Sequence, residues 1–461
     1  MVTTTHTDRL AGYAAGFRFE QLSQKAIDEA KLVLLDTIGT TLLGSLPKYA
    51  ASRLTGDLAR QLGGVPECTV IGRGFKTNVA SAALANGTMG YAADAEGGGI
   101  WRQHIAAVVV PTVLTVGEKE HASGKTAIAA LALAYDISGR IDKASDAKAF
   151  YPHSFHPSAV YGHFAAATAT AHFLKLDQAK FVNALGLAGI NAGGLMTWVN
   201  DPTENSRPYP IGMAAHCGVM AGYLAKLGMG GPLGIADDNK FTIYDAYSGA
   251  MNLDEITTGL GEDFWITRRG GFKPYQCCGD IFAGLDGLIK IVTENDLKPD
   301  DIAEVIHHPH SGRATVVDNN PLRSHCSQYI MAVAAVRRGI DSDTILVDLR
   351  ETDPEIREMA KRTRLIGDAD KLYPELGQGS GVVDVTTRDG RHFREVVPRW
   401  RGHEQNPLPR SEIDEKFFKL ATMRIPRERA ERVFALVNDL ENLDDMARLM
   451  ELLSVPEEEV S

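Results

Sequence analysis

The feature that most constrains this fold is a series of alanine-rich segments whose apolar residues recur with the period of an α-helix. Gly, Pro and Asn separate these segments, which is typical of helix ends and connecting loops. Several of them are apolar on nearly every face, and such helices are buried in a bundle or at a subunit interface. The pattern predicts a large helical domain. The segments are 24–43, 79–93, 126–141, 159–174, 180–195 and 211–227.

The character of the sequence changes after about residue 270. Residues 302–307 are β-branched and bounded by polar turns, which predicts a strand. Residues 382–386 and 392–397 alternate in polarity around an Arg-Asp-Gly turn, which predicts a hairpin. Helical patterns lie between these strands, at 327–338 and 353–362. This stretch therefore has the pattern of an α+β segment.

Helical periodicity returns near the carboxyl end of the chain, in residues 411–420, 428–442 and 444–453. A length of 461 residues is too great for one ordinary core, so two domains are expected. We therefore predict a mainly α protein with an α+β part. A large all-helical domain is built from residues 1–269 and 404–461, and a smaller α+β lid domain, residues 270–403, is inserted into it.

Charge and hydropathy exclude several classes of protein. The net charge of −11 argues against a nucleic-acid surface, because phosphate binding depends on clustered cations. No apolar run approaches the roughly 18–20 residues that cross a bilayer, and the amino terminus lacks the pattern of a signal peptide. The five cysteines, an odd and sparse set, fit a reducing compartment better than a disulfide framework. We expect a cytoplasmic protein with no nucleic-acid or membrane partner.

Ionisable residues within the small-residue stretches are the candidates for chemistry. Small residues let neighbouring elements pack closely, so the polar groups between them are expected to lie in a cleft. Acid/base groups, cations and a phenol together suit proton transfer next to a carboxylate. Arg102, beside one of the histidines, is a weaker second cation for binding substrate. The principal candidates are Asp94, His104, His156, Arg207, Lys273 and Tyr329.

The same stretches carry a family resemblance. NGTMGYAAD at 86–94, HIAAVVVP at 104–111, FHPSAVYGHFAAA at 155–167, KPYQCC at 273–278 and SQYIMA at 327–332 follow one another in the order found in the MmgE/PrpD family. The match is colinear over nearly the whole chain, which resembles this family throughout. The resemblance implies the same two-domain plan, an active site between the domains, a homodimer built through the helical domain and chemistry without a cofactor.

The resemblance also implies roles for single residues. Asp94 and His104 stand at the spacing of the family's aspartate and histidine, and a carboxylate bonded to imidazole would orient the ring. Either His104 or His156 could be the base. Arg207 stands where the family has its site lysine, and its planar fork suits a bidentate clamp on a substrate carboxylate. By the same resemblance, Lys273 matches a cation of the family's active site and Tyr329 matches a phenol of that site.

Structural roles compete with these assignments. His156 could cap the helix that follows it, and Tyr329 could lie in a core. Arg207 could be a solvated loop residue, and Lys273 could form an ion pair. The pair of His153 and His156 lacks a third ligand for zinc, so we predict neither a metal nor an organic cofactor.

The chain departs from the family pattern at several positions. Glu96 keeps one acid after Asp94, but glycine follows where a second acid is usual. Tyr91 stands where a histidine is common, and Phe282 is about where another is expected. The glycines 97–99 lack the context of a phosphate loop and predict a flexible rim of the active site.

The predicted function is a cofactor-independent lyase that removes a proton next to a carboxylate of a small di- or tricarboxylate, similar to 2-methylcitrate dehydratase. An imidazole base, cations that stabilise enolate-like charge and a proton donor are what this reaction needs. Epimerisation, isomerisation or decarboxylation of a related carboxylate are alternatives, since His104 and His156 could serve the two faces of one carbon. A non-catalytic paralogue that binds a carboxylate is a further alternative.

Overall fold

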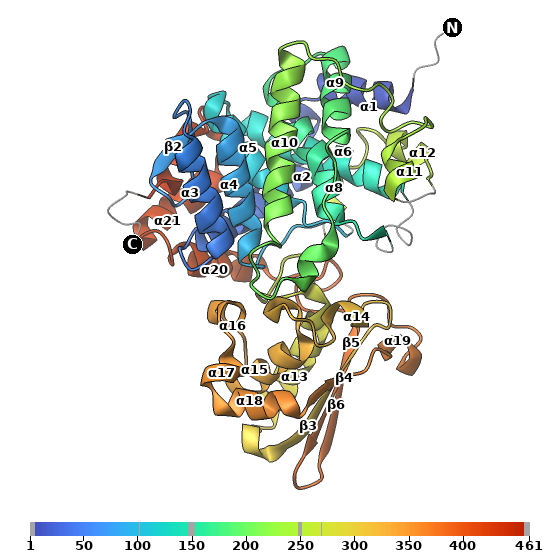
Figure 1. Cartoon of the computed structure of the whole chain (residues 1–461), viewed down its shortest axis with the longest axis vertical. Coiled ribbons are helices and arrows are strands. Elements are labelled where there is room, and N and C mark those ends of the chain that lie inside the picture. Colours follow the sequence, from blue (N-terminus) through green and yellow to red (C-terminus); the bar gives the residue numbers. More distant parts are fainter. Residues whose placement is uncertain (1–4, 101, 146–152, 248–250, 269, 456–461) are drawn as a thin grey trace. The chain divides into compact units, whose positions relative to one another are not determined.

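The computed structural model describes residues 5–100, 102–145, 153–247, 251–268 and 270–455. The chain divides into two compact units. Unit 1 comprises Met1–Thr197, Asn205–Gly270 and Arg410–Ser461. Unit 2 comprises Trp198–Glu204 and Gly271–Pro409. Figure 1 shows the two ends of the chain, in blue and red, contributing helices to unit 1.

Unit 1 is built from helices, as the periodicity predicts. Side chains of Ser23, Asn78, Ser123 and Asp177 accept hydrogen bonds from the first turns of α2, α4, α6 and α9, which fixes where these helices begin. The major helices of the first 230 residues are α1 (His6–Gly16), α2 (Gln24–Gly44), α3 (Ala50–Leu62), α4 (Val79–Ala92), α5 (Ala106–Lys119), α6 (Gly124–Lys143), α8 (Pro157–Phe173), α9 (Gln178–Gly189) and α10 (Tyr209–Lys226).

Small residues let the central helices of unit 1 pack closely. Helix α10 packs against α8 and α4, and α6 packs against α8. A Cβ added to Gly218 of α10 would lie 2.4 Å from the Cβ of Ala166 in α8, so no larger side chain fits there. The carboxyl-terminal helices α20 (Arg410–Ala421), α21 (Arg427–Asn438) and α22 (Ala447–Leu453) complete the unit, with α20 against α2.

The smaller elements of unit 1 are a hairpin and two short helices. Strands β1 (Cys68–Val70) and β2 (Phe75–Thr77) pair antiparallel. Helices α11 (Ile243–Tyr247) and α12 (Asp254–Thr257) follow α10.

Unit 2 is an α+β unit around a four-stranded sheet of order β4-β3-β5-β6. The predicted strand and hairpin are confirmed as β3 (Ile302–Pro309), β5 (Gly381–Thr387) and β6 (His392–Val397). Strand β5 pairs antiparallel with both β3 and β6, and Gly390 adopts a positive φ of 89° in the β5–β6 turn. The sequence pattern did not reveal β4 (Thr363–Leu365), which is parallel to β3, nor did it reveal β1 and β2 of unit 1.

Helices pack against the sheet of unit 2 and against one another. Helix α13 (Phe282–Glu294) contacts β5, β6 and α15 (Ser327–Arg337), and α15 contacts α18 (Pro354–Lys361). The remaining helices are the short α14 (Ala314–Val317), α16 (Ser342–Leu346), α17 (Leu349–Thr352) and α19 (Ala369–Leu372). The mainly α fold with an α+β part is thus confirmed. Within the described residues, no helix is both long and apolar enough to span a bilayer.

Candidate active site

The candidate site in unit 1 begins where α4 ends. Helix α4 stops at Ala92, and Asp94 follows with a positive φ of 52°, a left-handed conformation that Asp tolerates better than most residues. Only 2% of Asp94 is exposed to solvent. This turn directs the chain through Glu96 and the glycines 97–99 towards His104, before α5 begins.

The glycine loop is fixed by hydrogen bonds to three other parts of unit 1. The Gly97 N–H donates to Asp36 Oδ2 at 2.8 Å, and the Tyr135 hydroxyl donates to the Gly98 carbonyl at 2.6 Å. The Gly99 carbonyl accepts from Gly270 N–H at 2.6 Å. The loop predicted to be a flexible rim is therefore held by a hydrogen bond at each of its three glycines.

His104 is held by a buried carboxylate and by α8. Its Nδ1 lies 2.8 Å from Glu96 Oε1, and the Glu96 side chain is fully buried while that of His104 is 36% exposed. The His104 backbone N–H donates to Ser158 Oγ at 2.8 Å. The sequence spacing favours Asp94 as the carboxylate that orients this ring; in the structure Glu96 contacts Nδ1. With Nδ1 on Glu96, Nε2 is the nitrogen left for a substrate.

His156 lies next to His104. It occupies the N-cap position of α8, its backbone N–H donates to the Gly194 carbonyl at 2.8 Å, and its side chain forms no capping bond with the helix. The His104 and His156 rings are 6.4 Å apart between centroids. Tyr91 contacts both, at 5.1 Å from His104 and 6.1 Å from His156. Two imidazoles thus share one small site beside a phenol ring.

Arg207 lies beneath this cluster and is fully buried. Its Nη2 donates to the carbonyls of Tyr91 at 3.1 Å and Ala92 at 3.3 Å, the last residues of α4. Its guanidinium carbon lies 4.5 Å from the Tyr91 ring centroid, and Nη1 lies 3.5 Å from Asp94 Oδ1. Carbonyls at a helix C-terminus attract cations. These contacts support a positioning role for Arg207, whereas the predicted clamp on substrate stays a prediction.

Arg102 fastens the same loop to α6. Its Nη2 lies 2.5 Å from Asp142 Oδ1 and donates to Ser145 Oγ at 2.9 Å. Gln103 Nε2 donates to the other oxygen of Asp142 at 2.7 Å. Burial raises the pKa of Asp142, and the nearby Arg102 opposes that rise. The contacts of Arg102 are therefore those of a loop anchor.

Lys273 and Tyr329 belong to unit 2, and both are buried. The Tyr329 hydroxyl donates to the Thr344 carbonyl at 2.7 Å and accepts from Leu349 N–H at 3.2 Å. Burial raises the pKa of Tyr329 to about 12. Tyr329 thus joins α15 to α16 and to the start of α17, which matches the core role that competes with a site phenol. Asp94, His104, His156 and Arg207 are the predicted residues that the structure brings together in unit 1.

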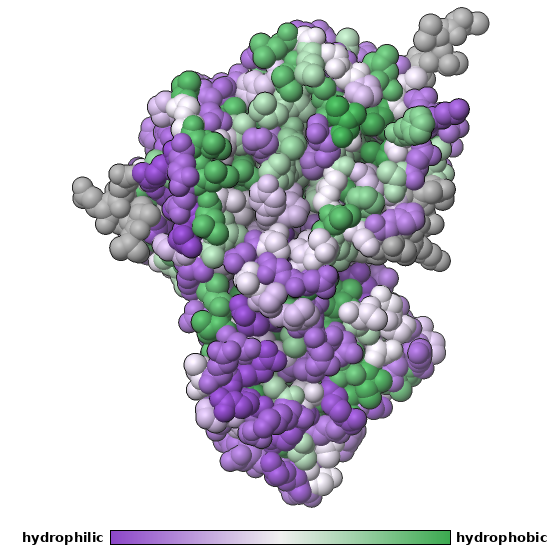
Figure 2. Space-filling model, in the orientation of Figure 1, coloured by the Kyte–Doolittle hydropathy of each residue, from purple (hydrophilic) through white to green (hydrophobic). Residues whose placement is uncertain are grey.

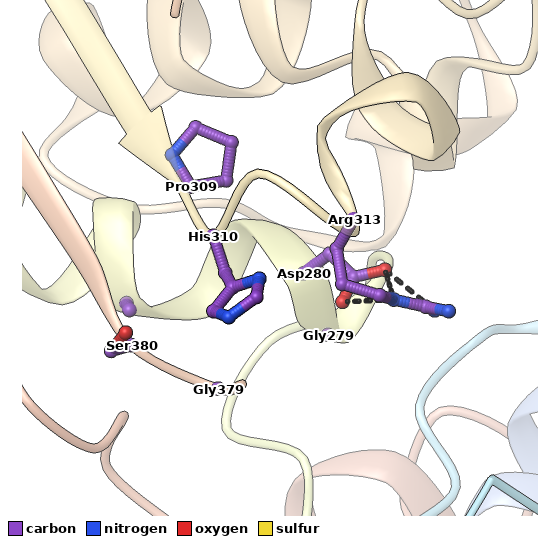
Figure 3. A pocket seen from close by; sticks show the side chains of 8 residues that line it. Gly279, Asp280, Pro309, His310, Arg313, Gly379 and Ser380 are labelled. Carbon is purple, nitrogen blue, oxygen red and sulfur yellow. Dashed lines mark hydrogen bonds and ion pairs between the residues drawn. The ribbon is translucent and has the colours of Figure 1, made fainter. Parts of the chain in front are cut away.

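A small pocket of unit 2 contains none of the predicted site residues. Figure 3 shows His310, Ser380 and the paired Asp280 and Arg313 around it. Arg313 Nη2 lies 2.9 Å from Asp280 Oδ2. The volume of about 10 Å³ suits a single water molecule, so this pocket is too small for a substrate.

The MmgE/PrpD N-terminal domain matches residues 8–255, and the MmgE/PrpD C-terminal domain matches residues 275–442. The chain belongs to the MmgE/PrpD family. Its relatives include proteins named cis-aconitate decarboxylase. The one from Aspergillus terreus is 24% identical, covering 98% of this chain and 96% of the relative. The human one is 24% identical, covering 99% and 96%, and the one from Mus musculus is 26% identical, covering 99% and 95%.

Three residues of the candidate site were not predicted from the sequence: Glu96, Ser158 and Tyr91. In the sequence, Glu96 stands out only because it keeps one acidic residue of the family's run after Asp94. No local pattern indicates that its side chain contacts His104. Ser158, two residues after His156, ties α8 to His104. Tyr91, where the family commonly has a histidine, carries its ring between the two imidazoles and Arg207. These partners are separated by up to 116 positions in sequence, so only folding brings them together.

Proposed function

We propose that this member of the MmgE/PrpD family is a lyase that acts on a small di- or tricarboxylate by proton transfer next to a carboxylate. The observation that carries the proposal is the Glu96–His104 pair facing His156. The relatives named cis-aconitate decarboxylase, aligned over nearly the whole chain, support a carboxylate substrate.

The Glu96–His104 pair is suited to general acid/base work. The Glu96 carboxylate lies 2.8 Å from His104 Nδ1, so a proton on Nδ1 would point towards it and the Nε2 lone pair would take a proton from substrate. The imidazolium that forms is then stabilised by the buried carboxylate beside it. His156 serves as the second proton-transfer group, within reach of the same small substrate. Lys273 is proposed to bind a substrate carboxylate.

Two lyase reactions are the first candidates, and epimerisation is the alternative. Decarboxylation of an unsaturated tricarboxylate such as cis-aconitate follows from the names of the relatives. Decarboxylation needs a proton donor for the carbanion that carbon dioxide leaves behind, whereas dehydration of a hydroxy tricarboxylate such as 2-methylcitrate needs a base for the carbon proton and a proton for the departing hydroxyl. Epimerisation uses the two imidazoles on opposite faces of one carbon.

The test is an assay of the full chain against a panel of di- and tricarboxylates. Release of carbon dioxide identifies decarboxylation, and an absorbing C=C product identifies dehydration. Deuterium entering the unreacted substrate from deuterated water identifies epimerisation. We expect His156→Ala to lower kcat by about 10²–10⁴-fold, because a general acid or base contributes that much.

A matched control for His156→Ala is His163→Gln in the same helix. His163 Nδ1 donates to the Ala159 carbonyl at 2.7 Å, and burial lowers the pKa of His163 to about 4, so it stays neutral. Binding of a carboxylate without turnover would favour the non-catalytic alternative. The predicted independence of cofactors is tested by repeating the assay after chelation and dialysis, with unchanged turnover as the expected result.

A further inference from the structure

Unit 1 contains a second pocket, at the opposite end of α8 from His156. Its volume is about 320 Å³, at the lower end of the range of about 300–1,000 Å³ typical of small-molecule sites. His172, near the end of α8, lines it. At 1.5 Å per residue, His156 and His172 are about 24 Å apart along the helix. The second pocket is therefore distinct from the candidate active site.

The second pocket has apolar walls beside its polar lining residues. Ala14 and Ala15 of α1 form one side of it, and Phe181 of α9 and Leu176 form another. Phe181 is fully buried and Leu176 is 6% exposed. Figure 1 shows α1 beside α9 in unit 1. Such walls favour a hydrocarbon chain, because its burial removes apolar surface from water.

The rim of the second pocket is cationic. Arg18 and Lys175 line it and are both exposed. Arg18 Nη1 donates to the carbonyls of Ala15 at 3.1 Å and Phe17 at 2.6 Å, which holds the guanidinium at the rim. Thr126, which also lines the pocket, lies in the first turn of the 20-residue helix α6. The amino-terminal end of a helix carries partial positive charge, which adds to the positive charge of the rim.

The remaining polar groups near the second pocket leave its charge positive. Burial, together with the Arg18 charge, lowers the pKa of His172 to about 4, so its ring is neutral at pH 7. Among the described residues that line the pocket, none is acidic. Asp177, which follows Leu176, accepts a hydrogen bond from Lys180 N–H as the cap of α9. A protein with a net charge of −11 thus carries a local site for an anion.

We propose that the second pocket binds a small monocarboxylate with a hydrocarbon chain. The carboxylate lies on Arg18 and Lys175, and the chain lies against Phe181 and Leu176. This site is independent of the proposed lyase reaction, because none of its residues belongs to the Glu96–His104–His156 cluster.

The first test is calorimetric titration of the full chain with hexanoate, hexanol and hexylammonium, which share one chain length and differ in charge. We expect hexanoate to bind at least about tenfold more tightly than the other two, since a hydrogen bond to a charged group is worth that much. Equal affinity for hexanoate and hexanol would overturn the proposal.

Two variants test the residues of the second pocket. Lys175 has a positive φ of 52°, which Asn tolerates, so Lys175→Asn removes the charge and keeps the backbone. We expect Lys175→Asn to weaken hexanoate binding about tenfold. Ala15→Phe should abolish binding by filling the pocket. Lys180→Gln, a charge change on α9 outside the lining, is the matched control and should bind hexanoate as the wild type does.

The location of the ligand is tested by soaking a crystal with 6-bromohexanoate and locating bromine by anomalous diffraction. Bromine between α1 and α9 is the expected result. Bromine only beside His104 and His156, or no bromine in the protein, would refute the site. Wild-type affinity in folded Lys175→Asn would likewise refute it, whether or not Ala15→Phe folds.

Discussion

At the scale of single residues, the chemistry of unit 1 depends on which carboxylate reaches which base. Glu96 has a fully buried side chain, whereas the His104 side chain is 36% exposed. One end of the imidazole is thus fixed inside the protein, and the other remains open to a small molecule. A buried charge is tolerated when a charge of opposite sign lies beside it. Removing Glu96 would leave a protonated His104 without such a partner.

The first prediction concerns Glu96→Gln. The amide still accepts a hydrogen bond from Nδ1–H but no longer stabilises the imidazolium, so kcat should fall by about 10²-fold or more. The matched control is Asp445→Asn, which alters an exposed carboxylate–histidine pair in which Asp445 Oδ2 lies 2.8 Å from His121 Nδ1. Steady-state kinetics of both variants provides the check; equal activities would remove Glu96 from the mechanism.

The second prediction separates the two roles of Arg207. If Arg207 positions α4, Arg207→Lys loses the hydrogen bonds from Nη2 to the Tyr91 and Ala92 carbonyls, and both kcat and the melting temperature should fall while KM changes little. If Arg207 clamps the substrate, KM should rise and the melting temperature should stay the same. We expect the first outcome, because Arg207 is fully buried against these carbonyls.

At the scale of elements, the apolar sequence of α6 is explained by its burial inside unit 1 and not by a subunit interface. The apolar segment 126–141 suggests a dimer face, but in the structure α6 is buried along almost its whole length inside unit 1. The exposed apolar residues lie elsewhere. Leu54, Leu58 and Leu62 form a stripe along α3 with exposures of 53%, 42% and 66%, and Figure 2 shows hydrophobic side chains gathered over that helix.

The third prediction is a homodimer that uses the leucine stripe of α3. Large exposed apolar patches usually mark interfaces. Leu58→Glu should therefore shift the protein from dimer to monomer at micromolar concentration, measured by light scattering. Leu372→Glu, a similarly exposed leucine at 41% on α19, is the control and should leave the mass unchanged. A wild-type mass equal to the 49.9 kDa monomer would count against the interface.

At the scale of the whole molecule, buried histidines couple stability to pH in both units. Burial lowers the pKa of His163 in unit 1 to about 4 and that of His307 in unit 2 to about 3, from an ordinary value of 6.5. The unfolded chain therefore takes up protons below pH 6.5 that the folded chain excludes. The free energy of unfolding is highest above pH 6.5 and falls as the pH is lowered towards 4.

The fourth prediction follows for His307→Gln. Between pH 7 and pH 5, each such histidine should lower the free energy of unfolding by about 2 kcal/mol. Removing His307 should make this pH-dependent fall in the free energy of unfolding smaller by that amount, measured by urea unfolding of the full chain at both pH values. His121→Gln, in which the replaced side chain is 72% exposed, is the control and should show the wild-type fall. Equal falls in all three proteins would contradict the linkage.

The sequence by itself determined many of the elements, and the family. Periodic apolar segments gave α2, α4, α6, α8, α9 and α10, and alternation around an Arg-Asp-Gly turn gave the β5–β6 hairpin, because these patterns depend on neighbours a few positions apart. The same locality explains why β4 was missed. It has three residues, and its parallel pairing with β3 joins positions nearly 60 apart.

Only the tertiary structure decided the partners within the site. Glu96 rather than Asp94 contacts His104, Arg207 lies under Tyr91, and Tyr329 is bound within the core of unit 2. Each of these outcomes depends on which side chains meet after distant helices pack. Sequence spacing carries residue types and order, but a hydrogen-bond partner is chosen by distance and direction, which exist only in the folded chain.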